Sequence, residues 1–202
     1  MARFDSLTHM VAPFASTVPP FVAANAIRDG ARDYFRSVHA HTGEVTITIL
    51  AGSDRAIVEP DSDETEILAI SEVKFNDFNV LRKVQSIGCE ISGPPSAYMG
   101  IGNSTIRVSP IPKVDTNLIV KLALRPTFAA TEIEDEILLN NEEGIRYAAL
   151  VRLKRQPSTE WHSPSEVEYY SSLFNQEVGQ KRIEMLNGGL DGNLTMKIAS
   201  FM

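Results

Sequence analysis

The sequence has one cysteine, no surplus of basic residues and no long apolar run. Cys89 alone cannot form an intrachain disulfide, so nothing indicates an oxidising compartment. The 26 acidic residues outnumber the 19 Lys and Arg residues and leave a formal net charge of −7, whereas general binding of nucleic acid needs a basic surplus. No apolar stretch approaches the roughly 20 residues that span a bilayer, and Asp5 interrupts any N-terminal signal peptide. We therefore expect a protein made in the cytosol that does not contact a membrane.

Sequence motifs of common enzyme chemistry are also missing. The chain has neither a phosphate-binding loop with Lys followed by Ser or Thr nor a Gly-x-Ser-x-Gly nucleophile turn. Gly100 and Gly102 begin a dinucleotide fingerprint, but Thr105 occupies the position of its third glycine. Asp61 begins a segment similar to a calcium loop, in which Glu66 replaces the required glycine. We predict that the protein is not an enzyme and has no catalytic residues, no cofactor and no metal.

The best remaining candidates for a metal or ligand site are His39 and His41. In an extended segment, residues two apart project to the same side, and Glu44 is the acidic residue closest to them in sequence. A metal site needs a third and usually a fourth ligand, which this local pattern does not supply. A small-ligand-binding protein or enzyme with a site assembled from distant residues stays as a less favoured alternative.

The clearest helical pattern follows Pro19 and predicts an amphipathic helix over residues 20–38, with charged residues such as Arg32 on its flanks and back. Gly30 should weaken this helix by about 1 kcal/mol relative to alanine, unless a neighbouring element packs closely there. A further turn or two is predicted over residues 5–11. The apolar stripe of the long helix consists of Ala23, Ile27, Ala31, Tyr34 and Val38.

From Gly43 to Pro126 the apolar residues follow a period of two. Val45, Ile47 and Ile49 alternate with threonines, which is typical of a half-buried strand. Turns rich in Gly, Pro and Asp, including one at residues 100–103, separate several such segments and predict an antiparallel sandwich or barrel-like sheet. The other predicted strands span residues 55–59, 66–75, 104–109 and 116–124.

Helical signals return after Pro126. Thr131 and Glu134 have the spacing of a capping box. Residues 145–153 are small and apolar almost all round, which predicts a buried central helix. Ser163 followed by Pro164 predicts the start of a last helix that ends at Gly188 and Gly189. The predicted apolar face of that helix consists of Val167, Tyr170, Phe174, Val178 and Met185.

These patterns predict an α+β protein, in which an antiparallel α-helical bundle carries an inserted antiparallel β domain and an extended C-terminal arm. The N-terminal part of the bundle covers residues 1–42, the β domain 43–126, the C-terminal helices 127–187 and the arm 188–202. The arm has more apolar surface than a free tail usually carries, so it either folds back on its own domain or binds a partner. Its apolar residues are Leu190, Leu194, Met196, Ile198 and Phe201.

The order of several short segments resembles a known family. The proline-started helix and the strands are followed by a small-residue helix and a last helix ending in FxxEVGQ, with four short segments along the way. These are VSPIP (Val108–Pro112), LALRP (Leu122–Pro126), RLKRQP (Arg152–Pro157) and WHSP (Trp161–Pro164). Over about residues 18–186, the sequence resembles the head-to-tail adaptor proteins of tailed bacteriophages, particularly those of short-tailed phages.

This resemblance implies a structural virion protein, assembled in the host cytoplasm and located at the head–tail junction. Similar adaptors form a ring of about twelve subunits under the portal protein ring, with the β domain directed toward tail or nozzle proteins. The genomic DNA passes through the channel, and an acidic wall lets it slide without specific binding. The arm residues Leu190, Leu194, Met196, Ile198 and Phe201 would bind the portal.

Two questions stay open at the level of sequence. A different virion component, such as a head-completion or tail-terminator ring protein, accounts for the same helix stripes and strand alternation. Trp161 is either an interface anchor or an aromatic residue that packs at the start of the last helix.

Overall fold

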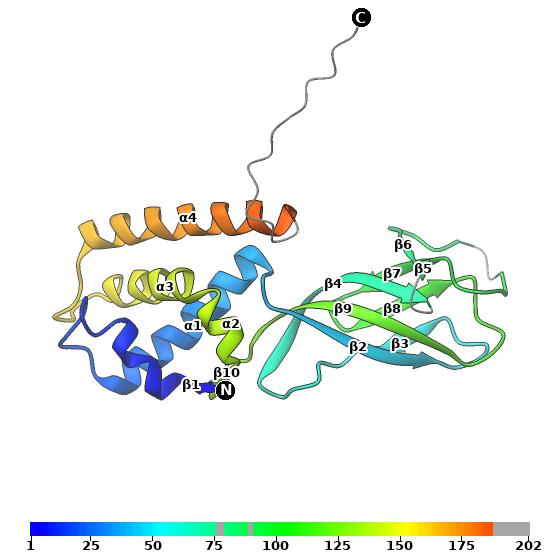
Figure 1. Cartoon of the computed structure of the whole chain (residues 1–202), viewed down its shortest axis with the longest axis horizontal. Helices are drawn as coiled ribbons and strands as arrows, with labels where there is room; N and C mark the ends of the chain where they lie inside the picture. Colours follow the sequence, from blue (N-terminus) through cyan, green and yellow to red (C-terminus); the bar gives the residue numbers. More distant parts are fainter. Residues whose placement is uncertain (76–78, 89–90, 188–202) are drawn as a thin grey trace, which may run out of the picture.

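The computed structural model describes residues 1–75, 79–88 and 91–187, so Cys89 and the arm residues 188–202 lie outside the described part of the chain. The described residues form an elongated α+β fold with helices at one end and a group of strands at the other (Figure 1). The helices are η1 (Phe4–Met10, a 3-10 helix), α1 (Pro20–Val38), α2 (Asp135–Leu139), α3 (Glu142–Lys154) and α4 (Pro164–Leu186).

The strands form three sheets. A two-stranded sheet pairs β1 (Ala2–Arg3) with β10 (Glu132–Ile133) beside the helices. One four-stranded sheet has the order β2-β9-β4-β5 and the other β3-β8-β7-β6. Their strands are β2 (Thr42–Ile49), β3 (Arg55–Ile57), β4 (Thr65–Phe75), β5 (Asn79–Val80), β6 (Arg82–Lys83), β7 (Ala97–Ile101), β8 (Thr105–Ser109) and β9 (Thr116–Pro126).

We call the helices with β1 and β10 the helical body, and strands β2–β9 the β body. In sequence, the β body is inserted between α1 and α2, as predicted. The buried apolar side chains fall into two clusters, one in each body. In the β body, Leu118, Val120 and Leu122 of β9 are fully buried, because they belong to the hydrophobic cluster of this body. Strand β9 is paired on both sides, with β2 and with β4.

Two details of the predicted β domain were wrong. Strands β6 and β7 pair in parallel, so the β body is mixed and not purely antiparallel. The turn predicted at residues 100–103 is shifted, because β7 extends to Ile101 and the turn lies at residues 102–104. Gly102 has a φ of 67° there, a conformation that glycine adopts without strain, whereas Gly100 is an ordinary strand residue.

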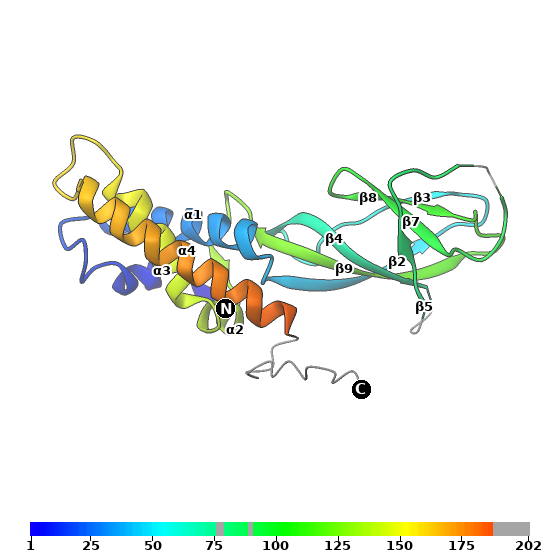
Figure 2. The ribbon, with the colours of Figure 1, turned by 90° about the horizontal axis from the view of Figure 1, so that it is seen from above.

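The helical body is built around α3, which packs against both α1 and α4 (Figures 1 and 2). The predicted central position of residues 145–153 is confirmed, since Ile145, Leu150 and Leu153 are fully buried. The α1 stripe is confirmed as well. All five of its predicted members, Ala23, Ile27, Ala31, Tyr34 and Val38, are buried.

The starts of the later helices, and the burial of the apolar face of α4, differ in part from the prediction. The capping box at Thr131 and Glu134 was wrong, because α2 begins at Asp135 and no side chain caps it. Helix α4 does begin at Pro164, after Ser163. Its predicted apolar face is only partly covered, because Met185 is 40% exposed in the described part of the chain.

Gly30 marks a close crossing of α1 and α3. A Cβ atom at residue 30 would lie only 2.7 Å from the backbone nitrogen of Ala149. Gly144 of α3 faces the Tyr34 ring of α1, which a Cβ atom at residue 144 would strike. Helix α3 is therefore the neighbouring element that packs closely on Gly30. Gly30 and Gly144 together let α1 and α3 approach each other.

We expect Gly30→Ala to lower the free energy of unfolding by about 1–3 kcal/mol, because overpacking outweighs the gain in helix propensity. Urea denaturation followed by circular dichroism measures this change. Gly179→Ala in α4 is the matched control: nothing lies within 4 Å of a Cβ there, so propensity should stabilise it by up to about 1 kcal/mol. Equal stabilisation by both substitutions would contradict the close crossing.

Candidate functional site

The two histidines singled out in the sequence do not share a site. His39 is the C-cap of α1, where its φ of 57° turns the chain out of the helix and its backbone N–H donates to the Phe35 carbonyl at 2.8 Å. This turn leaves His39 exposed and His41 buried. Within residues 1–75, 79–88 and 91–187, no group of three or more His, Cys, Asp or Glu side chains is arranged to hold a metal ion.

His41 lies where the two bodies meet. Its ring packs edge-on against Phe35 with the centroids 5.4 Å apart, and its side chain is only 4% exposed. Burial lowers the pKa of His41, and the negative charge of Glu134 opposes that effect only in part. His41 is therefore a neutral ring in the junction at physiological pH.

The acidic turn that begins at Asp61 has a structural role. The Glu64 carboxylate accepts hydrogen bonds from the Thr131 backbone N–H at 2.5 Å, from the Thr131 hydroxyl at 3.0 Å and from the Glu132 N–H at 3.4 Å. These bonds, first of all that from the Thr131 backbone, lower the pKa of Glu64. Thr131, expected to cap a helix, thus binds this loop of the β body instead.

A buried arginine, predicted to lie on the flank or back of its helix, joins the bodies. Arg32 of α1 is 4% exposed. Its Nη1 donates to the Pro126 carbonyl at 2.5 Å and its Nη2 to Glu66 Oε1 at 3.0 Å. The same Glu66 oxygen accepts a bond from Arg125 Nε at 2.5 Å, and the Arg32 guanidinium carbon lies 3.5 Å from the centroid of the Phe128 ring. We call Arg32, Glu66, Arg125, Pro126 and Phe128 the junction cluster.

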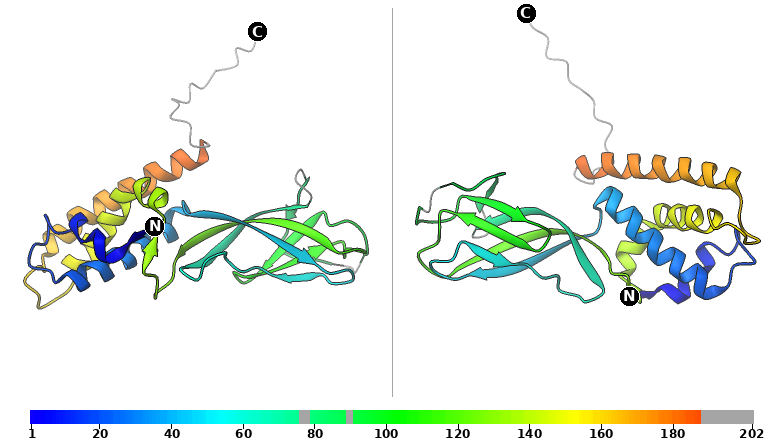
Figure 3. Two further views of the ribbon diagram at one scale, coloured as in Figure 1. Left: turned by 60° about the horizontal axis from the view of Figure 1, so that its bottom comes forward. Right: turned by 180° about the vertical axis from the view of Figure 1, so that it is seen from behind.

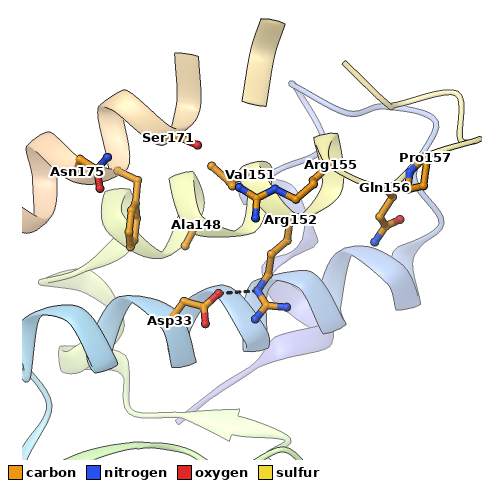
Figure 4. Close-up of a pocket in the computed structure, with 10 residues that line it drawn as sticks. Asp33, Ala148, Val151, Arg152, Arg155, Gln156, Pro157, Ser171 and Asn175 are labelled. Atoms are coloured by element: carbon orange, nitrogen blue, oxygen red, sulfur yellow. Dashed lines mark hydrogen bonds and ion pairs between the residues drawn. The ribbon is translucent and has the colours of Figure 1, made fainter. Parts of the chain in front are cut away.

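An open concavity lies in the helical body, between α1 and α4 (Figure 4). It has a volume of about 670 Å³. Ala148 and Val151 of α3 and Phe174 of α4 supply apolar surface, while Asp33, Arg152 and Arg155 supply charge. We call this concavity the α1–α4 groove. No sequence pattern predicted it, because its walls come from three separate helices.

The two arginines of the groove differ in their partners. Arg152 Nε donates to Asp33 Oδ2 at 2.7 Å, and its Nη1 lies 3.4 Å from Asp29 Oδ2. The hydrogen bond to Asp33 raises the pKa of Arg152 and fixes its side chain across α1 (Figure 4). Arg155 is exposed and forms no ion pair with any described residue. The groove therefore presents apolar surface beside one uncompensated positive charge, which suits an acidic and partly apolar partner segment.

Trp161 packs against the helical core and donates from Nε1 to the Gln156 side chain at 3.2 Å. This contact supports the interpretation that it packs at the start of α4. The predicted portal-binding residues Leu190, Leu194, Met196, Ile198 and Phe201 lie outside the described residues.

No protein-family description matches the chain, and no curated protein matches its sequence. Of the helices in the described part of the chain, none is long and apolar enough to cross a membrane.

We expect Glu66→Gln to lower the free energy of unfolding by about 1–3 kcal/mol, because it leaves the buried Arg32 charge without its counter-ion. Glu72→Gln on the same strand is the control, since its ion pair with Lys74, at 3.4 Å, is partly exposed and should be worth about 0–1 kcal/mol. Urea denaturation of both variants makes the comparison. Equal losses would contradict a special role of the junction cluster.

His41 should make stability depend on pH. Because its pKa is lowered from 6.5 in the folded state, the unfolded chain takes up a proton first as the pH falls. The neutral His41 ring therefore adds to the free energy of unfolding above pH 6.5, and this contribution is lost as the pH falls through the folded-state pKa of His41. We expect His41→Phe to flatten the slope of melting temperature against pH below 6.5, whereas His39→Gln, at the exposed position, should keep the wild-type slope. An unchanged slope in His41→Phe would exclude the junction histidine as its source.

Proposed function

We propose that the chain is a structural subunit of an adaptor ring between the portal vertex and the tail or nozzle of a tailed bacteriophage. In this proposal it binds the portal protein ring and copies of itself, about twelve in the assembled ring, and contacts a tail or nozzle protein. The ring joins head to tail and continues the DNA channel, through which genomic DNA passes without specific binding. The protein is assembled in the host cytoplasm and stays at the head–tail junction of the virion.

The observation that carries this proposal is the end of α4. Ile183, Met185 and Leu186 are 60%, 40% and 86% exposed, and the chain continues directly into the apolar arm. A helix that ends in exposed apolar side chains before a further apolar segment is typical of a surface that another protein covers. We assign that partner to the portal, with Leu190, Leu194, Met196, Ile198 and Phe201 as the residues that bind it.

The arrangement of the two bodies supports the same function. They lie at opposite ends of an elongated subunit (Figure 1), so one subunit can contact two partners at once. Leu50 and Val114 are 63% and 69% exposed in two loops of the β body that a hydrogen bond from Gly52 N–H to the Pro112 carbonyl, 2.9 Å long, holds together. We propose that these loops contact the tail or nozzle protein.

Removal of residues 189–202 should abolish binding to the portal ring and leave the fold intact. One short arm makes a weak single contact, and a ring of subunits multiplies such contacts into a stable assembly. Light-scattering mass of the portal ring mixed with the chain measures the effect. We expect about twelve added copies for the full chain and none for the truncated one.

Two controls complete this experiment. An unchanged melting temperature of the truncated chain shows that it is folded, and Val80→Asp in the β body, at a position 58% exposed, should bind the portal like the wild type. Full binding by the truncated chain would contradict the assignment of the arm. Binding of the full chain to a tail-tube end instead of the portal would identify a tail-terminator ring, and binding to another head protein a head-completion ring.

A further inference from the structure

The α1–α4 groove and helix α2 lie on different sides of the helical body. Seen from above, α1 and α2 lie on opposite sides of α4 (Figure 2), and the views of Figure 3 show α1, α3 and α4 together. The groove belongs to the α1 side, since Asp33 of α1 forms part of its wall. One subunit therefore presents the groove in one direction and α2 in the other.

We propose that a second copy of this chain inserts its α2 segment into the α1–α4 groove. The inference deepens the proposed function and rests on it, because it names the contact between neighbouring subunits of the ring. A closed ring of identical subunits needs two different surfaces on each subunit, one complementary to the other. Two surfaces on opposite sides of the body meet that requirement, and self-pairing of one surface would end at a dimer.

Helix α2 and the residue before it, Glu134, carry acidic side chains and an exposed leucine; we call residues 134–139 the α2 segment. Leu139, its last residue, is 73% exposed. Glu134 and Glu136 are exposed and make no ion pair in the described part of the chain, while Asp135 binds the N-terminal amine of Met1 at 2.7 Å. The segment is thus acidic and ends in an apolar side chain that its own subunit does not cover.

The groove is complementary to this segment in both respects. Its apolar surface, formed by Ala148, Val151 and Phe174, can cover one leucine side chain. On its rim Arg155 has no ion-pair partner among the described residues, whereas Arg152 is already compensated by Asp29 and Asp33. Opposite uncompensated charges orient two copies and disfavour the contact of like surfaces. We expect the Leu139 side chain over the apolar surface and Glu136 near Arg155.

A single contact of this kind is small and therefore weak. It becomes effective when the portal holds many subunits side by side, since each bound neighbour raises the local concentration of the next α2 segment. We therefore expect the free chain to stay monomeric at micromolar concentration and the contact to form on the portal.

Charge exchange tests the contact in the full chain. We expect Arg155→Glu and Glu136→Arg each to weaken cooperative loading of the portal. The concentration of chain that half-saturates the portal should rise at least tenfold for each variant. The double variant should regain most of this loss, because every interface then has the two charges exchanged. Glu44→Arg, which reverses an exposed charge on β2, should load like the wild type. Melting temperatures show whether each variant is folded.

Cysteine cross-linking gives a second measurement. In a Cys89→Ser background, a chain with Leu139→Cys and Val151→Cys should form disulfide-linked multimers on the portal, and chains with either cysteine alone should form at most dimers. Failure of the double charge variant to recover, together with absence of multimers, would overturn the inference. So would cross-linking of Val151→Cys to Leu194→Cys instead, which would place the arm in the groove.

These outcomes separate the inference from the function it rests on. If the wild-type chain loads the portal normally but the α2 contact is absent, only the inference is wrong. If the wild-type chain does not bind the portal at all, the proposed function is wrong and the inference falls with it.

Discussion

The buried guanidinium of Arg32 holds the two bodies together. A charge that is 4% exposed is tolerated only when its donors are satisfied, and these donors bind Glu66 of β4 and the Pro126 carbonyl at the end of β9. Helix α1 and two strands must therefore meet at one point before the charge is compensated. The Glu64 carboxylate adds bonds to Thr131 and Glu132, so the β body is attached to the segments before and after it in the chain.

The sequence predicted those helices and strands whose own apolar pattern matches the side chains that they bury. The stripe of α1 and the alternation in β2 and β9 have sequence periods that match their burial. Helix α3 is buried, as its small apolar residues all round predicted. Two of the wrong predictions concern contacts between distant segments. Thr131 has the spacing of a helix cap, but it donates its hydrogen bonds to Glu64, 67 residues away, and caps no helix. Strand β6 is two residues long and paired in parallel with β7, and so short a strand has no period of its own.

The candidate site was predictable only in part for the same reason. The spacing of His39 and His41 suggested a shared site, but the left-handed turn at the end of α1 separates an exposed ring from a buried one. Arg32 looked like a surface residue of α1, because its partners are 34 and 94 residues away in the chain. The RLKRQP segment that contributed to the resemblance contains both arginines of the groove, yet nothing in it indicates that α1 and α4 will form the walls.

The β body leaves and rejoins the helical body through two strands that lie side by side. Thr42, at the start of β2, is paired with Ala123 near the end of β9. The helical body therefore meets the insertion at a narrow stem. All buried members of its own hydrophobic cluster lie outside the β body, and Leu68 of β4 packs against them. Any insertion whose two ends are similarly close can replace the β body, provided that it supplies the carboxylate and carbonyl which Arg32 requires. Such an architecture lets the distal end diversify, in length and in the surface it presents, while the helices keep the same packing.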